Sequence, residues 1–146
     1  MRRFPAGVAV VTVNLDGERV GLTVGTFVSL SLEPPLVGFA VSRQAALHEL
    51  LRRAGAFAAS LLGEGQERVA QHFARGVPPI ALWEAIELEP DEGPPLLAGA
   101  TGWLRGRVST DHSAGTHTFF VGEVEEARRG PATRPLVHLG GRYLAV

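Results

Sequence analysis

Residues 21–36 combine hydroxyl side chains, glycine and apolar residues in one stretch that ends in two prolines. Thr23, Gly25 and Thr26 fall at the end of an apolar run. Backbone N–H groups together with Thr and Ser hydroxyls can bind a phosphate or the polar edge of a ring without a dedicated charge. The stretch is therefore a candidate ligand-binding segment. The alternative is a strand whose polar side faces water, because alternating Ser and apolar residues are common in sheets.

His117 stands between two threonines, just after a glycine-containing segment. An imidazole at the start of a strand can donate a hydrogen bond, act as a general acid or bind a metal ion. Asp111 and His112 precede it closely, but their spacing does not aim three ligands at one point on a helix or strand. We therefore expect no metal site, and an exposed loop histidine is the alternative to a functional one.

Near the C-terminus, Gly140 and Gly141 are followed by Arg142 and Tyr143. Two glycines allow close backbone approach, a guanidinium binds phosphate or carboxylate, and a phenol ring can stack on a flat ligand. The alternative is a β-bulge followed by an ordinary strand.

Several kinds of chemistry are excluded by what the chain lacks. Without cysteine it has no disulfide, thiolate nucleophile or cysteine-bound metal. All 14 basic residues are arginine, so no lysine can form a Schiff base or serve a P-loop. A net charge of -1 creates no field that attracts nucleic acid, and no apolar run has the length of a membrane span. Neither a GxGxxG nor a GxSxG motif is present.

Runs of apolar and β-branched residues predict that most of the chain forms strands. These strands must position the candidate residues described above. We expect strands over residues 8–13, 20–27, 36–41, 57–62, 101–110, 118–127 and 136–146, the last interrupted by two glycines. Leucines at helical spacing predict a helix capped by Ser42 and ended by Gly55, and a second helix over residues 66–75. Residues 77–97 are expected to form a covering loop with one short strand at 85–88, and residues 111–117 a connecting loop.

The strands come mainly as hairpins, which favours an antiparallel barrel over a parallel sheet. The composition, 45% apolar and 20% charged, is ordinary for a globular protein. Residues 1–146 contain no repeat or linker, so we expect one domain, mainly β, with two or three short helices.

Four segments in this order resemble the flavin reductase family, which has the split-barrel flavin-binding fold. They are residues 4–12, 21–36, 117–124 and 141–143. Within the family, the resemblance is to the reductase components of two-component aromatic hydroxylases. It implies noncovalent FAD or FMN, and NADH rather than NADPH as the reductant, since no arginine cluster marks a 2′-phosphate site.

The resemblance also implies roles for particular residues. The flavin ring and ribityl chain would contact Thr23, Val24, Gly25, Thr26, Phe27 and Val28, and the flavin phosphate would lie near Ser42, Arg43, Gln44, Ala45 and Leu47. Ala45 and Leu47 replace the Ser and Thr common in the family, so phosphate binding would depend on Arg43, Gln44 and helix N–H groups. The nicotinamide and flavin cleft would be lined by Phe4, Gly7, His117, Gly140, Gly141, Arg142 and Tyr143. His117 would position the nicotinamide, and no residue is strictly required as a catalytic acid or base.

The resemblance further implies a cytoplasmic homodimer that supplies reduced flavin to a partner monooxygenase, with no nucleic-acid or membrane partner. Two alternatives remain open. One is a flavin- or heme-binding barrel without reductase turnover, and the other is a structural barrel without a ligand.

Overall fold

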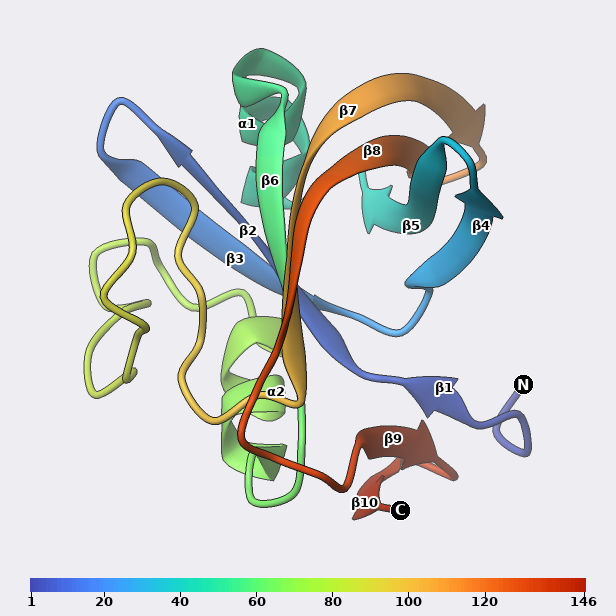
Figure 1. The fold of residues 1–146 in the computed structure, drawn as a ribbon, viewed down its shortest axis with the longest axis vertical. Helices are drawn as coiled ribbons and strands as arrows, with labels where there is room; N and C mark the ends of the chain where they lie inside the picture. The colour runs from blue at the N-terminus through green and yellow to red at the C-terminus, as the bar shows by residue number, and fades with distance from the viewer.

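The computed structural model describes residues 1–146 and contains two antiparallel sheets. The seven-stranded sheet has the order β3-β2-β6-β7-β8-β5-β4. Its strands are β2 (Ala9–Leu15), β3 (Glu18–Val24), β4 (Val28–Leu32), β5 (Pro35–Ser42), β6 (Ala56–Leu61), β7 (Gly102–Ala114) and β8 (His117–Arg129). The three-stranded sheet contains β1 (Ala6–Gly7), β9 (Leu136–Leu139) and β10 (Arg142–Ala145), with β9 in the middle. Figure 1 shows this small sheet beside both chain ends.

The core lies between the curved large sheet and the helices. Strand β2 is buried along most of its length because its Val-rich sequence is covered on both faces. Phe39 of β5 is the centre of an aromatic group: its ring lies 5.2 Å from Phe57 and 6.0 Å from Phe120. These buried rings fix the curvature that brings β5 and β4 around toward the start of the chain (Figure 1).

Helices α1 (Ala46–Ala54) and α2 (Glu67–Ala74) lie near opposite ends of the large sheet (Figure 1). Gly55 ends α1 as predicted, with φ of 69° and its N–H bonded to Leu51 O. The predicted cap was wrong: α1 begins at Ala46 with Ala45 before it, and no side chain caps it. The Ser42 hydroxyl instead accepts from the N–H of Gln44 at 3.3 Å within the preceding turn. Neither helix has the length and apolar character that a membrane span requires.

The prediction for residues 20–36 missed one strand. Strand β3 ends at Val24 instead of running to residue 27, and residues 28–32 form β4, which pairs with β5. The alternating Ser and apolar residues therefore form a strand, but its apolar side is exposed as well, with Leu32 89% exposed. Strand β4 is an edge strand that is exposed along most of its length.

The loop predicted for residues 111–117 was also wrong. Strands β7 and β8 continue through it and pair as far as Ala114 with His117, which leaves only Gly115 and Thr116 in the turn. Polar residues had suggested a loop, but they are polar because this end of the hairpin is exposed on both faces.

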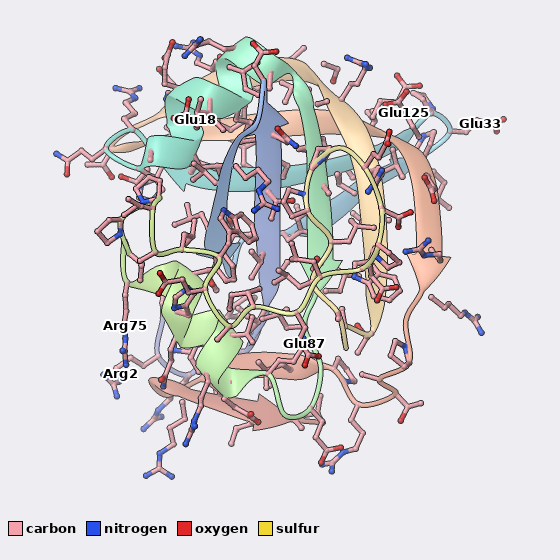
Figure 2. The ribbon with its side chains drawn as sticks, turned by 90° about the vertical axis from the view of Figure 1, so that its left-hand side faces the viewer. Arg2, Glu18, Glu33, Arg75, Glu87 and Glu125 are labelled. Carbon is pink, nitrogen blue, oxygen red and sulfur yellow. The ribbon has the colours of Figure 1, made fainter.

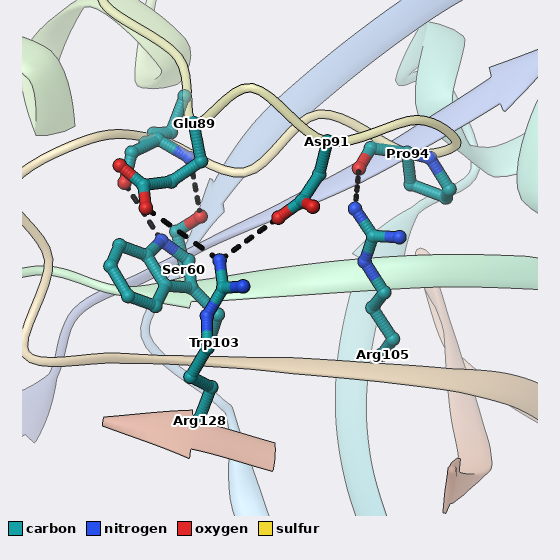
Figure 3. A network of polar contacts seen from close by, with 8 residues as sticks. Ser60, Glu89, Asp91, Pro94, Trp103, Arg105 and Arg128 are labelled. Atoms are coloured by element: carbon teal, nitrogen blue, oxygen red, sulfur yellow. Dashed lines mark hydrogen bonds and ion pairs between the residues drawn. The ribbon is translucent and has the colours of Figure 1, made fainter. Parts of the chain in front are cut away.

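Residues 87–97 form a strap across strands β2, β6 and β7, where the sequence predicted a covering loop. Figure 3 shows part of its attachment. Trp103 Nε1 donates to Leu97 O at 2.8 Å, Leu97 N–H donates to the Ser60 hydroxyl at 3.0 Å, and Arg128 pairs with Asp91 at 2.9 Å and with Glu89 at 3.6 Å. The short strand expected at residues 85–88 is absent, since only an isolated bridge joins Leu88 to Leu97.

The large sheet does not close into a complete barrel. Strands β3 and β4 are its two edges, and the chain crosses between them through residues 25–27 without sheet pairing. The mainly antiparallel β fold with two helices is confirmed, and the opening between the edges is the split of the split barrel. The small sheet lies near this crossing segment (Figure 1).

Candidate functional site

A cleft of about 680 Å³ lies between the crossing segment and the small sheet. Its lining comes from three parts of the chain that are far apart in sequence. These residues are Met1, Arg2, Phe4, Pro5, Ala6, Gly7, Gly25, Thr26, Phe27, Val28, His138, Gly140 and Gly141. The structure thus brings together eight of the predicted site residues: Phe4, Gly7, Gly25, Thr26, Phe27, Val28, Gly140 and Gly141.

The crossing segment offers main-chain donors to this cleft. The N–H groups of Gly25, Thr26 and Phe27 make no hydrogen bond within the chain, because the segment lies between the end of β3 and the start of β4. The Thr26 hydroxyl is engaged elsewhere: it accepts from the N–H of Ala40 at 2.9 Å, just beyond the last β4 pair. The ring of Phe27 stacks on Phe39 at 5.8 Å, which anchors the segment to the core. A ligand in the cleft therefore lies against a backbone segment whose N–H groups are unpaired and whose position is fixed by side chains.

Two residues predicted to touch the flavin lie outside the cleft lining. Thr23 donates its hydroxyl to Ala70 O of α2 at 2.7 Å, so its polar group is used to attach that helix. Val24 is 4% exposed and belongs to the hydrophobic core. Both belong to β3, where the ladder leaves them no freedom to face the opening.

The N-terminal segment forms one wall of the cleft and is attached to the opposite end of the chain. Strand β1 pairs with β9 through Ala6 with His138 and Gly7 with Val137. Arg2 adds two bonds: its carbonyl accepts from Gly140 N–H at 2.9 Å, and its Nη2 donates to Gly140 O at 3.0 Å. Phe4 is 65% exposed within this wall, an unusual position for so large a ring unless a partner or ligand covers it.

The turn of the β9–β10 hairpin forms the rim of this same wall, because β9 pairs with β1 and Gly140 bonds to Arg2. Gly140 and Gly141 have φ of 63° and 82°, which allows the tight turn, and both line the cleft. Arg142 and Tyr143, predicted for the same cleft, do not line it. Tyr143 instead packs against His138, with the two ring centres 5.0 Å apart, and burial raises the pKa of its phenol.

The predicted phosphate turn lies in another part of the surface. Arg43 donates to the Ser113 hydroxyl at 2.5 Å, and its N–H donates to Thr116 O at 3.1 Å, so the turn after β5 is tied to the β7–β8 hairpin. Gln44, Ala45 and Leu47 line a separate cavity of about 280 Å³ beside Phe73 and residues 76–79. Ser42 and residues 43–47 are thus not part of the cleft lining.

His117 joins this second region. It pairs with Ser42 across the β5–β8 ladder, is exposed, and its Nδ1 lies 2.9 Å from the Thr116 hydroxyl. Nearby Asp111 forms an ion pair with Arg52 at 3.3 Å, and no group of three His, Asp or Glu side chains is arranged to hold a metal ion. The start of β8 is where the sequence placed His117, but the cleft described above does not include it.

The cleft can bind a flat, partly apolar ligand but offers no acid–base pair. Its lining consists of aromatic, aliphatic and glycine residues with Arg2, Thr26 and His138, the backbone N–H groups of residues 25–27 are unpaired, and no aspartate or glutamate lines it. Two lining residues with polar side chains, Arg2 and His138, were not predicted. Arg2 could have been predicted from the sequence because it lies two residues before Phe4, which was predicted to line the cleft. Chemistry in such a site must come largely from the bound molecules, and the chain supplies position and polarity.

The chain belongs to the family described as "Flavin reductase like domain", whose model matches residues 1–146. The predicted resemblance is thereby confirmed. Among curated relatives, the chain is 46% identical to the reductase component of 4-hydroxyphenylacetate 3-monooxygenase from Thermus thermophilus, over 98% of this chain and 90% of that protein. It is 40% identical to an NADH-dependent FAD reductase from Streptomyces globisporus, over 96% of this chain and 79% of that protein.

Solved structures agree with the fold and its class. The NADH:FAD oxidoreductase of Streptomyces globisporus C-1027, solved with NAD and FAD fragments, matches with a TM-score of 0.90 and 39% identity over 97% of this chain and 86% of that chain. The flavin reductase component of a bacterial two-component tryptophan halogenase matches with a TM-score of 0.86 and 31% identity, over 99% of this chain and 92% of that chain.

Proposed function

We propose that this protein is an NADH-dependent flavin reductase that transfers hydride to FMN or FAD and releases the reduced flavin to a partner monooxygenase. The observation that carries the proposal is the cleft, which is lined by residues 25–27, whose N–H groups make no hydrogen bond within the chain, and by aromatic and glycine residues. Membership of the flavin reductase family and the names of the relatives support the same activity.

The residues present fit a flavin. The cleft volume of about 680 Å³ lies within the range of roughly 300–1,000 Å³ typical of ligand pockets. The polar edge of an isoalloxazine ring needs hydrogen-bond donors, and the N–H groups of Gly25, Thr26 and Phe27 are free to provide them. Phe4, Gly7, Gly140 and Gly141 would line the remainder, with the glycines leaving room for close approach.

The bound cofactors supply the chemistry, a hydride transfer from nicotinamide to flavin. The chain's own contribution is to hold the two rings against each other and to exclude water between them. When a flavin is bound, the unpaired N–H groups at residues 25–27 would supply hydrogen-bond donors that favour negative charge at the polar edge of the reduced ring. No side chain needs to gain or lose a proton, which suits a cleft without an acid–base pair.

We propose that the second region, which contains His117 and residues 42–47, has the roles predicted from the sequence. There His117 would position the nicotinamide, and the N-terminus of α1 would approach the flavin phosphate. Support comes from their pairing in one ladder, Ser42 with His117, and from the unsatisfied N–H groups of an uncapped helix start. Thr23, Val24, Arg142 and Tyr143 would act behind the cleft by supporting its walls.

A partner monooxygenase follows from the kinds of protein that resemble this chain. Relatives include reductase components of 4-hydroxyphenylacetate and 4-nitrophenol monooxygenases. Because a diffusible product must leave, we expect a flavin dissociation constant in the micromolar range, about -8 kcal/mol of binding free energy. The proposal includes a cytoplasmic site of action, where NADH is available.

A homodimer is also part of the proposal. The apolar side chains of Val28, Leu30 and Leu32 are exposed on edge strand β4, which has unpaired backbone groups along one side. Val28 also lines the cleft, so a second copy on this edge would lie next to the ligand.

The activity is tested by following NADH oxidation with FMN, FAD and riboflavin side by side. We expect each flavin to stimulate oxidation, NADH to be used in preference to NADPH, and no metal to be required. If no flavin stimulates oxidation while flavin binding is still seen by fluorescence, the protein is a flavin-binding module and the reductase proposal is wrong.

A further inference from the structure

Arg2 is the one lining residue of the cleft that carries a charge at every physiological pH. The lining contains no aspartate or glutamate, and Arg2 forms no ion pair anywhere in the chain, whereas Arg52, Arg107, Arg128 and Arg134 each pair with a carboxylate. In Figure 2, Arg2 lies at the end of the molecule that holds the small sheet, while Glu18, Glu33 and Glu125 lie toward the opposite end. The cleft therefore has an uncompensated positive charge.

The guanidinium is held in place by the turn that it faces. Its Nη2 donates to Gly140 O at 3.0 Å, and the Gly140 N–H donates back to the Arg2 carbonyl at 2.9 Å. A Cβ added to Gly141 would lie 3.1 Å from Arg2 Nη2, so the guanidinium fills the space that a side chain at position 141 would need. Of the five N–H donors of an arginine, this arrangement uses one. The others remain available at the cleft.

We propose that Arg2 binds a phosphate of a nucleotide cofactor whose ring occupies the cleft: either the diphosphate of NADH, or the flavin phosphate in place of the turn at residues 42–47. A guanidinium is the side chain best suited to phosphate because its planar fork matches two oxygens at once. The hydrogen bond from Arg2 to Gly140 O reduces the entropy lost when the ligand binds, since the Arg2 side chain is already ordered. The inference rests on the proposed function, which supplies the two anionic ligands: NADH, and FMN or FAD.

The experiment compares ligands with and without phosphate. Binding of FMN and of riboflavin is followed by flavin fluorescence in the wild type, Arg2→Gln and Arg3→Gln, and the KM for NADH is measured with riboflavin as acceptor. Arg3 is the matched control, because it carries the same charge next along the chain but does not line the cleft.

We expect Arg2→Gln to weaken one phosphate-bearing ligand by about tenfold, as loss of a charge-assisted contact should. A raised FMN dissociation constant with unchanged riboflavin binding assigns Arg2 to the flavin phosphate. A raised KM for NADH with unchanged binding of both flavins assigns it to the dinucleotide. Arg2→Lys should recover part of the loss, because it keeps the charge.

The inference is overturned if FMN and riboflavin weaken equally, which indicates a structural role, or if Arg2→Gln behaves like Arg3→Gln. A loss of fold in Arg2→Gln would be seen in its melting temperature. In that case the wild type decides: raising the salt concentration should weaken FMN or NADH but not riboflavin, and equal weakening of all three rejects the inference. If the wild type oxidises no NADH, the proposed activity fails, while the comparison of FMN with riboflavin still tests Arg2.

Discussion

Gly141 is constrained in two ways: by its backbone conformation and by the side chain that lies beside it. Its φ of 82° lies in the left-handed region, and the space beside it is taken by the Arg2 guanidinium. Gly17 has a similar φ of 87° in the β2–β3 turn, but a Cβ added there would have no atom within 4 Å, and the residue lies away from the cleft. The two glycines therefore share the conformational demand and differ in what a side chain would displace.

We expect Gly141→Ala and Gly17→Ala to lower the free energy of unfolding by similar amounts, about 1–2 kcal/mol each. Only Gly141→Ala should weaken FMN or NADH, because its methyl group pushes Arg2 away from the rim. Urea unfolding measures the first effect, and flavin fluorescence with steady-state kinetics measures the second. Equal ligand affinity in the two variants would contradict this view of the rim.

Residue identity was predictable where the chain carries a local signal. Gly25, Thr26, Gly140 and Gly141 stand out in the sequence, and all four line the cleft. Arg2 and His138 were missed because each acquires its role from residues more than a hundred positions away. No local pattern contains such a contact. The Thr23 hydroxyl donates to Ala70 O of α2, another contact between distant segments that no local pattern indicates.

At the level of elements, the strap of residues 87–97 shows how an irregular segment is fixed by polar contacts. Trp103 is 5% exposed, donates to Leu97 O, and has Arg128 4.9 Å from its ring centre. Trp83 has the same pair of contacts in an exposed setting, with an N–H donated to Arg19 O at 2.9 Å and Arg19 5.2 Å from its ring. The two tryptophans differ chiefly in whether water could reach the backbone carbonyl if the indole N–H were removed.

We expect Trp103→Phe to lower the free energy of unfolding by about 2 kcal/mol, because Leu97 O is left buried without a partner. Trp83→Phe should cost roughly 1 kcal/mol less, since water can reach the Arg19 carbonyl. Urea unfolding followed by far-UV circular dichroism measures both. Equal losses would show that the strap does not exclude water from this carbonyl.

Elements were predictable where burial and pattern agree. The apolar runs of β2, β5 and β6 gave correct strands, and Gly55 ended α1 as expected. Strand β4 was missed, and β7 was predicted to end at residue 110 instead of 114, because these segments are exposed and burial gives them no clear pattern. Pairing with a neighbouring strand decides such segments, and that pairing is not a property of the segment itself.

For the whole molecule, the proposed dimer would be formed through the exposed edge of β4. Leu32 of this strand is 89% exposed, and Ile80, in the loop after α2, is 92% exposed. Neither residue buries apolar surface within one chain. Substituting each of them separately therefore tests whether the β4 edge, and not another exposed apolar residue, is buried between two copies of the chain.

We expect sedimentation to give a dimer for the wild type and a mass near 15.5 kDa for Leu32→Asp, because a charge would be buried in the interface. Ile80→Asp should remain dimeric. A wild-type mass near 15.5 kDa, or an equal effect of both variants, would reject a dimer formed through β4.

The small sheet also determines when during its synthesis the protein can become active. Strand β9 pairs with β1 at one side and with β10 at the other, so one wall of the cleft joins residues 6–7 to residues 137–138. Contacts between such distant segments form late, because the entropy of closing the intervening chain must be overcome first. While a ribosome is still making β7 and β8, strands β4 and β5 cannot yet join the sheet, because β5 pairs with β8, and the small sheet on the other side of the cleft does not yet exist. Both sides of the cleft therefore form only after β8 and β9 have been made, and a chain released before β9 would have most of the large sheet without the small sheet.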